Sequence, residues 1–178
     1  DDEGTVIREE CTVEGNNHII KGVAQDTHTA RISVLNVKNI PGVAYKVFQS
    51  LADDHIVVDM IVQSVQTSND NMTDIIFTID NADLADAKRS LGKLQAEGLL
   101  SKIIYDDDMA KISIVGAGML GTPGVAARMF GALGRAGVNI LIVSTSEISV
   151  SCLIERENVE KAVQAIHKEF FQEACGNN

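Results

Sequence analysis

The sequence predicts an α+β protein of two ferredoxin-like βαββαβ units in tandem, with antiparallel sheets, helices on one face of each sheet, and the first unit inserted in the second. The main observation is a repeat. A strand, a Pro-Gly-Val-Ala turn, a helix and a strand occur at residues 32–64 and again at residues 112–146. The two prolines are about 80 residues apart, a period that is too long for a solenoid and suits a small domain. The second observation is an unmatched strand before the first copy, at residues 18–24.

Each copy begins with a strand that ends at the turn residues Pro41-Gly42 or Pro123-Gly124. We expect the prolines in the first helical turn, where a residue without an amide hydrogen is tolerated, and the glycines where the backbone approaches a neighbour closely. The helix after the turn is predicted from an apolar stripe on one face, which indicates core residues. The stripe consists of Val43, Ala44, Val47, Phe48 and Leu51 in the first copy and of Val125, Ala126, Met129, Phe130 and Leu133 in the second.

Two further strands and a second helix complete the β-α-β-β-α order of each copy. Runs of β-prone residues predict the second strands at residues 57–62 and 140–144 and the third strands at residues 74–79 and 148–154. The second helix is again amphipathic. Its apolar positions are Leu84, Ala87, Leu91 and Leu94 in one copy and Val159, Val163, Ile166 and Phe170 in the other.

The closing strand of the second unit is expected to come from the N-terminal side of the chain. Residues 102–105 close the first unit, but only polar or small residues come after Phe171. In strand order 4-1-3-2 the strand at residues 111–115 would therefore keep an open edge. We predict that residues 18–24 pair antiparallel with residues 111–115. The alternative is an independent hairpin between residues 18–24 and 30–35.

Composition limits the classes of function. Of the 178 residues, 45% are hydrophobic, which is enough for two small cores, although units of this size are marginal without a neighbouring domain or a second subunit. A net charge of −10, the lack of Trp and the lack of a basic cluster argue against nucleic-acid binding. No apolar run reaches membrane length and no signal peptide is visible, so we expect a soluble, cytoplasmic protein without membrane contact.

Cysteine and histidine residues do not indicate a metal or redox site. Cys11, Cys152 and Cys175 are odd in number and lack CxxC spacing, which favours free thiols in a reducing compartment. The four histidines are scattered along the chain. The hydroxyl run at residues 144–146 has no evident activating base and is typical of a turn after a strand. We therefore expect no metal and no catalytic residue.

A glycine motif leaves one enzymatic alternative open. Gly116, Gly118 and Gly121 form G-x-G-x-x-G between a predicted strand and a predicted helix, which is the context of dinucleotide binding. The equivalent turn of the first copy lacks these glycines, and the strand at residues 139–143 does not end in the acidic residue that would bind a ribose. We therefore expect no cofactor, and a nucleotide-binding enzyme that uses this loop is the alternative.

Five short motifs together form a recognisable pattern. They are Pro41-Gly42-Val43-Ala44, Ile61-Val62-Gln63-Ser64-Val65, Thr73-Asp74-Ile75, Asn139-Ile140 and Ser144-Thr145-Ser146-Glu147-Ile148. These motifs resemble the tandem ACT domains of aspartate kinases (aspartokinases), over about residues 5–171. One Pro-Gly module alone would indicate an ACT domain, whereas two in this order, with the Ser-Thr-Ser-Glu-Ile run, point to aspartate kinase.

The resemblance implies a regulatory region without its catalytic domain. The family's catalytic domain carries a Lys-Phe-Gly-Gly-Thr motif that this chain lacks, and residues 4–7 are similar to the family's exit from the kinase domain. The chain begins at Asp1 rather than Met. We expect an excised region or a small regulatory subunit that does not phosphorylate aspartate alone. The implied domains are residues 26–108 as the first ACT domain and residues 18–25 plus 109–172 as the second, with an exit segment at residues 1–17 and a tail at residues 173–178.

The resemblance also implies an effector site at the first Pro-Gly turn. The carboxylate of an amino acid would meet the amides at the start of the helix after Gly42, where the helix dipole favours an anion. In similar proteins the first unit supplies most contacts, and the facing second unit, often from the partner subunit, supplies the rest. The implied effector-binding residues are Asn39, Ile40, Pro41, Gly42, Val43, Ala44, Gln63 and Thr73 in the first unit and Asn139 and Ile140 in the second.

The implied function is allosteric feedback inhibition by lysine, threonine or both in the biosynthesis of aspartate-family amino acids. It would operate through a homodimer of ACT domains that acts on the aspartate kinase catalytic domain or on a larger subunit. The sequence does not distinguish the two effectors. Asn39 stands where family members often have an aspartate that accepts from the effector ammonium, so this site keeps an acceptor oxygen but no charge. A ligand-free ACT dimerisation scaffold is the remaining alternative.

Overall fold

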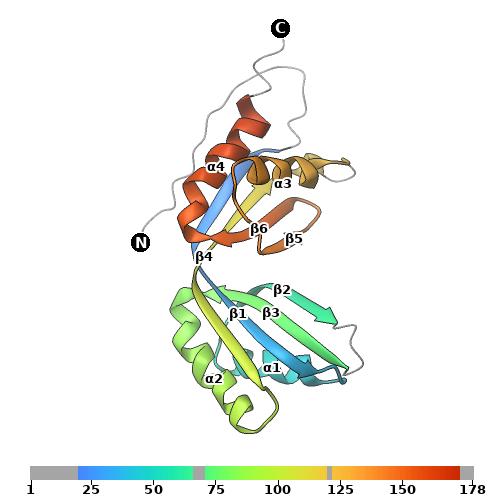
Figure 1. Ribbon diagram of the computed structural model, residues 1–178, viewed down its shortest axis with the longest axis vertical. Coiled ribbons are helices and arrows are strands. Elements are labelled where there is room, and N and C mark those ends of the chain that lie inside the picture. The colour runs from blue at the N-terminus through green and yellow to red at the C-terminus, as the bar shows by residue number, and fades with distance from the viewer. Residues whose placement is uncertain (1–19, 66–70, 120–121, 173–178) are drawn as a thin grey trace. The chain divides into compact units, whose positions relative to one another are not determined.

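A computed structural model describes residues 20–65, 71–119 and 122–172. The chain divides into two compact units (Figure 1). His28–Met109 forms one of them, here called the inserted unit. The described residues up to Thr27 and those from Ala110 onward form the other, here called the discontinuous unit. The first unit is thus inserted in the second, as the sequence predicts.

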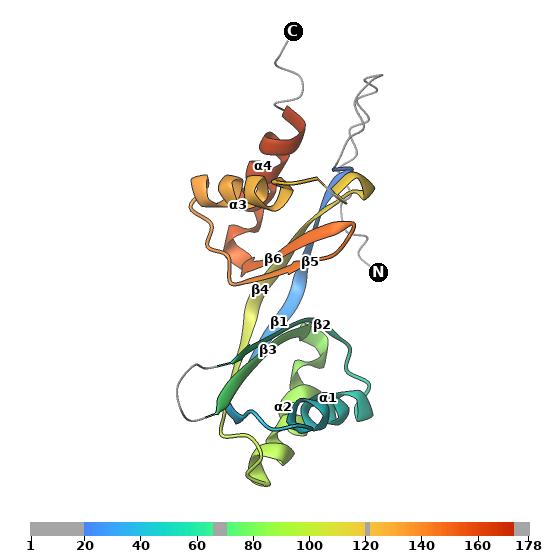
Figure 2. The same cartoon turned by 90° about the vertical axis from the view of Figure 1, so that its right-hand side faces the viewer.

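The inserted unit has the order β-α-β-β-α-β. Helices α1 (Val43–Asp53) and α2 (Leu84–Ala96) cover one face of its antiparallel sheet (Figure 2), and the 3₁₀ turn η1 (Asn81–Asp83) precedes α2. The strands pair in the order β2-β3-β1-β4, which leaves β2 at one edge. They are β2 (Val58–Val65), β3 (Met72–Asp80), the second part of β1 (Gly22–Lys38) and the first part of β4 (Lys102–Val115).

The sheet of the discontinuous unit repeats this arrangement. Its strands are in the order β1-β4-β6-β5, with β5 (Ile142–Thr145) at one edge and β6 (Ser149–Glu155) beside it. The amide of Lys21 donates to the carbonyl of Val115 at 2.7 Å, so the N-terminal strand closes this sheet. Residues 18 and 19 of the predicted strand lie outside the described residues.

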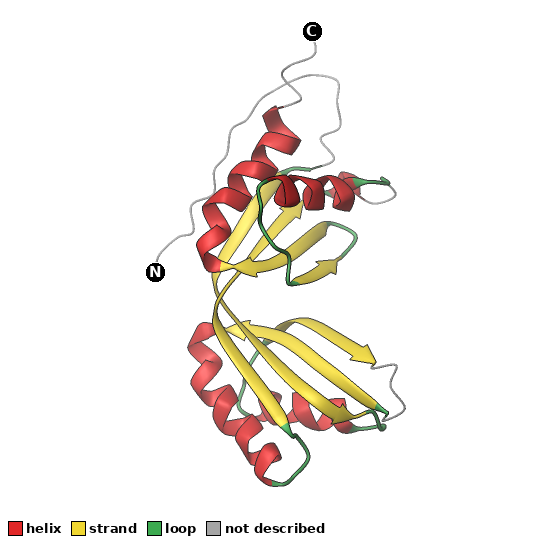
Figure 3. Ribbon diagram, viewed as in Figure 1, coloured by secondary structure: helices red, strands yellow, loops and turns green. Residues whose placement is uncertain are grey.

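Two longer helices cover one face of that second sheet (Figure 3). They are α3 (Val125–Arg135) and α4 (Val159–His167). Three short helices flank them: η2 (Ala117–Met119), η3 (Arg156–Asn158) and the π-helical η4 (Lys168–Gln172). No helix among the described residues is long and apolar enough to cross a membrane.

The strands β1 and β4 are each continuous, where the sequence predicted two separate strands. β1 is 17 residues long and β4 is 14. Residues 106–108 are all aspartates, a residue type that is depleted in strands, but pairing with neighbours overrides that preference. The guanidinium of Arg31 on β1 lies 2.8 Å from the carboxylate of Asp106, and Asn81 donates to the carbonyl of Asp107 at 3.2 Å.

The prolines do not lie in the first helical turn, and that expectation is wrong. The helices begin one residue after the glycines, because Gly42 and Gly124 are N-caps with φ of 92° and 90°. A left-handed residue cannot belong to a right-handed helix, and a side chain there would cost about 1–2 kcal/mol. Close approach does not explain these glycines either, since a Cβ at either position would meet nothing within 4 Å.

The predicted helical stripes lie in the core of each unit. In the inserted unit Val43, Val47 and Leu51 pack in one cluster with Ile32 and Phe77 of the sheet. Burying such a side chain contributes about 1.5–3 kcal/mol. The discontinuous unit has an equivalent cluster, which includes Val125, Met129, Leu133, Ile112, Ile114 and Ile166.

Candidate functional site

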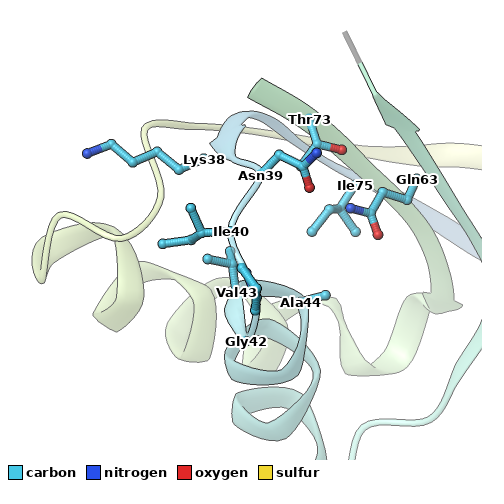
Figure 4. A pocket seen from close by; sticks show the side chains of 10 residues that line it. Lys38, Asn39, Ile40, Gly42, Val43, Ala44, Gln63, Thr73 and Ile75 are labelled. Atoms are coloured by element: carbon cyan, nitrogen blue, oxygen red, sulfur yellow. The ribbon is translucent and has the colours of Figure 1, made fainter. Parts of the chain in front are cut away.

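A cavity of about 430 Å³ lies in the inserted unit, where β1 ends and α1 begins. Its lining comes from the loop between these two elements, from the first turn of α1 and from the two neighbouring strands β2 and β3 (Figure 4). The lining residues are Lys38, Asn39, Ile40, Pro41, Gly42, Val43, Ala44, Gln63, Thr73 and Ile75.

The start of α1 supplies main-chain donors to this cavity. The helical hydrogen-bond ladder begins with Lys46, whose amide donates to the carbonyl of Gly42 at 3.1 Å. The amide of Ala44, a lining residue, precedes that ladder, and no side chain of the described residues caps the helix. Amides at a helix start lack intrahelical acceptors and carry the positive end of the helix dipole. This part of the cavity is therefore suited to an anion.

Hydrogen bonds hold the polar wall of the cavity in place. The amide of Asn39 donates to the carbonyl of Asn71 at 2.8 Å, and the Asn71 side chain donates back to the carbonyl of Asn39 at 3.1 Å. The Thr73 hydroxyl donates to the carbonyl of Ser64 at 2.8 Å. The side chains of Asn39 and Gln63 project toward the same space from different elements (Figure 4). Their amide oxygens can accept hydrogen bonds from an ammonium group.

The charge of the lining is limited to one lysine. Lys38 comes from the end of β1, and its side chain extends away from Gln63 (Figure 4). None of the described residues that line the cavity carries a carboxylate. Apolar side chains of Ile40, Val43 and Ile75 form the rest of the wall. The cavity therefore combines helix amides, neutral acceptors and an apolar surface, a combination that fits a small zwitterion.

The structure brings eight of the ten sequence-predicted residues together in this cavity: Asn39, Ile40, Pro41, Gly42, Val43, Ala44, Gln63 and Thr73. Asn139 and Ile140 belong to the discontinuous unit and do not line it; Asn139 is exposed, and Ile140 packs partly buried against the core of that unit. The role of all ten in binding stays a prediction.

Sequence reasoning missed two lining residues, Lys38 and Ile75. Ile75 could have been found from strand pairing, since it lies directly opposite Gln63 in the β2–β3 register and residues opposite each other share a face. Lys38 directly precedes the loop and could have been included by adjacency alone.

The glycine motif does not form a dinucleotide crevice. The amide of Gly116 is bonded to the carbonyl of Ile148 at 2.9 Å, and the carbonyl of Gly118 accepts from the Thr122 hydroxyl at 2.8 Å. The strand order also differs from that of a nucleotide-binding fold, because β6 lies between β4 and β5, whereas that fold has a parallel β-α-β unit with the pyrophosphate at the helix start. Gly121 lies outside the described residues.

The hydroxyl run at residues 144–146 ends strand β5, whose last two residues are Ser144 and Thr145, and Ser146 begins the turn to β6. Ser146 and Ser149 are joined by their hydroxyl oxygens at 2.8 Å and by a main-chain bond of the same length. Across the described segments, no group of three or more His, Cys, Asp or Glu side chains is placed to hold a metal ion.

Comparison with protein-family models identifies the family of this chain. The family model of the ACT domain matches residues 32–94 and 112–170, which together exceed half of the chain. Each match falls on one of the two copies of the repeat.

Three relatives illustrate the similarity. An aspartokinase of Corynebacterium glutamicum is 42% identical over 172 residues, which are 95% of this chain and 40% of that protein. The ligand-free regulatory subunit of aspartate kinase from Thermus thermophilus has a TM-score of 0.80 at 38% identity, over 85% of this chain and 99% of that one. A structure of aspartokinase alpha and beta subunits has a TM-score of 0.79 at 40% identity, over 85% and 98%. The chain thus spans about two fifths of the curated aspartokinase and nearly all of the regulatory subunit.

Proposed function

The chain belongs to the ACT-domain family, as a regulatory region of aspartate kinases, and from that premise we propose that it senses an amino acid and transmits feedback inhibition to an aspartate kinase catalytic domain or a larger subunit. The effector class is threonine, lysine or both. The chain would have no aspartate kinase activity alone.

The observation that supports this proposal most directly is the cavity at the start of α1. The carboxylate of a bound amino acid would accept from the amide of Ala44 at the start of α1, which has no helical acceptor. Its ammonium group would donate to the amide oxygens of Asn39 and Gln63, which enter the same space. The two ends of the zwitterion would then be bound by groups of matching polarity.

We expect threonine to bind more tightly than lysine in this cavity. The side chain of lysine adds a second cation, and no carboxylate among the described lining residues would neutralise it. Removing an ammonium from water without an opposite charge is costly. Threonine instead carries a methyl group, which would contact Ile40 or Ile75, and a hydroxyl, which would hydrogen-bond to the Gln63 amide.

Transmission of the signal would depend on assembly. Among the strands that the structure describes, β2 and β5 each have one side without a pairing partner, and exposed Ile61 and Val143 lie on them. Such edges favour pairing with another chain. We propose a homodimer through the ACT domains in which Asn139 and Ile140 of the partner complete the effector site. An effector shifts the kinase toward an inactive arrangement only by its differential affinity for the two arrangements.

Isothermal calorimetry and thermal unfolding of this chain with each of the twenty amino acids test the sensing function. Threonine should give saturable heat and raise the melting temperature by several degrees, since a hundredfold excess over Kd adds about 2.7 kcal/mol. Light scattering should report a dimer at micromolar concentration. If no amino acid at millimolar concentration gives heat or a shift, the sensing proposal fails and a ligand-free dimerisation scaffold replaces it.

A further inference from the structure

Strand β1 contains a bulge just before the cavity. The β1–β3 register shifts between Val34 and Val37, so that Leu35 and Asn36 together oppose Asp74. Asn36 has a φ of 55°, in the left-handed region that residues other than glycine seldom adopt. A bulge inserts one extra residue into a strand and redirects the residues after it, and bulges are common beside functional sites.

The bulge changes which side chains of β1 face the core. Ile32 and Val34 are fully buried before it, and Val37 is fully buried after it. Strict alternation would instead have placed Asn36 and Lys38 in the core, because side chains alternate with a period of two residues. The bulge therefore determines which side chains face the core where the chain enters the cavity loop, residues 39–42.

Two side chains outside the cavity satisfy the main-chain groups that the bulge removes from the sheet. The carboxylate of Asp74 accepts from the amide of Asn36 at 2.9 Å. The hydroxyl of Ser101 lies 3.1 Å from the carbonyl oxygen of Leu35 and 3.3 Å from that of Asn36. Neither Asp74 nor Ser101 lines the cavity. A hydrogen bond to a charged acceptor is the stronger kind, so Asp74 is the main restraint on the bulge.

We propose that Asp74 is a positioning residue for the effector: it holds the Leu35–Asn36 bulge and, through it, the cavity loop in the geometry that binds an amino acid. The inference rests on the proposed sensing function and extends it to a residue that does not touch the ligand. Without the carboxylate, the bulged amide loses this acceptor and a strand without the bulge becomes competitive. The apparent affinity then falls in proportion to the population that keeps the binding geometry.

Titration of L-threonine and L-lysine into three variants tests this role. Asp74→Ala should weaken the binding of the effector about tenfold, which corresponds to about 1.4 kcal/mol. Asp74→Asn should bind within about twofold of wild type, because its amide oxygen can still accept from Asn36. Asp80→Ala is the matched control. The carboxylate of Asp80 also accepts a hydrogen bond from a main-chain amide, that of Ala82, at 2.8 Å. Asp80, however, is the last residue of β3 and does not line the cavity.

Hydrogen exchange without ligand gives a second readout. Amides of residues 36–44 should exchange faster in Asp74→Ala and at the wild-type rate in Asp80→Ala. If wild type binds an effector and Asp74→Ala binds it equally well, the positioning role is overturned while the sensing function stands. If wild type binds neither amino acid, both are overturned. If Asp74→Ala does not fold, Ser101→Ala, which removes the other restraint on the same bulge, is judged by the same criteria.

Discussion

Asn39 and Asn71 are hydrogen-bonded in both directions. The Asn39 amide donates to the Asn71 carbonyl, and the Asn71 side chain donates to the Asn39 carbonyl. Asn71 has a φ of 49°, a left-handed conformation that asparagine tolerates better than most residues. This pair ties the loop before α1 to the segment that precedes β3, so the position of a cavity-lining residue depends on a residue outside the lining.

Two replacements of Asn71 should therefore separate the cost of its left-handed backbone from the contribution of its side-chain hydrogen bond. Asn71→Gly keeps the left-handed backbone and loses the side-chain bond, whereas Asn71→Ala loses the bond and adds strain. We expect Asn71→Ala to lower the free energy of unfolding by about 1–2 kcal/mol more than Asn71→Gly does. Urea unfolding of the two variants measures this difference. Equal stability of the two variants would contradict the strain argument.

The two N-cap glycines offer a matched pair of substitutions. Gly42 and Gly124 have nearly the same φ, and a Cβ at either position would meet no atom within 4 Å. Gly42→Ala and Gly124→Ala should each destabilise the chain by about 1–2 kcal/mol through backbone strain alone. Only Gly42→Ala should also weaken threonine binding, because only Gly42 lines the cavity. Calorimetry measures the affinity for threonine, and thermal unfolding measures the stability of each variant. A loss of affinity in Gly124→Ala would show that general destabilisation, rather than the change in the cavity, weakens binding.

Much of the fold could be predicted because the apolar positions that match between the two copies of the repeat are core positions. Positions such as Val47 and Met129 match in both copies and are both fully buried. The insertion was predicted by counting strands, and the bond from Lys21 to Val115 agrees with it. The cavity residues of the first unit could be proposed because the Pro-Gly turn marks where a strand ends and a helix begins.

Other features depend on pairing that a local pattern does not contain. The main-chain groups of the bulge at Leu35–Asn36 are hydrogen-bonded to Asp74 and Ser101, which are distant in sequence. The continuity of β4 through residues 106–108 likewise depends on a partner on another strand. The position of Pro41 before the N-cap could not be predicted either, since the residue type of Gly42 does not determine the sign of its φ.

Cys152 should make the stability of the chain depend on alkaline pH. Its side chain is fully buried, and burial raises the pKa of the thiol from 9.0 to about 12. Between these pH values the unfolded chain loses a proton that the folded chain keeps, so stability falls as pH rises, by about 1.4 kcal/mol per pH unit from this group.

Urea unfolding of wild type and Cys152→Ala between pH 8 and 10.5 isolates this contribution, because all other groups are common to both chains. The difference in unfolding free energy between the two should change with pH only above about pH 9. A difference that stays constant over this range would show that the thiol ionises similarly in the folded and unfolded states. Thiol reagents should also modify Cys152 only in molecules that have transiently opened or unfolded.

Gln63 and its neighbour Ser64 provide the sharpest test of the effector site. They are consecutive exposed residues of β2, so their side chains point to opposite faces of the sheet. Gln63 lines the cavity and Ser64 does not. Gln63→Ala should weaken threonine binding about tenfold while changing the free energy of unfolding by less than about 0.5 kcal/mol, because an exposed polar side chain is removed rather than a core one. Ser64→Ala should leave both quantities unchanged, since the Ser64 carbonyl that accepts from Thr73 is retained. If both variants bind threonine as wild type does, the amino acid binds elsewhere, and the cavity at the start of α1 is not the effector site.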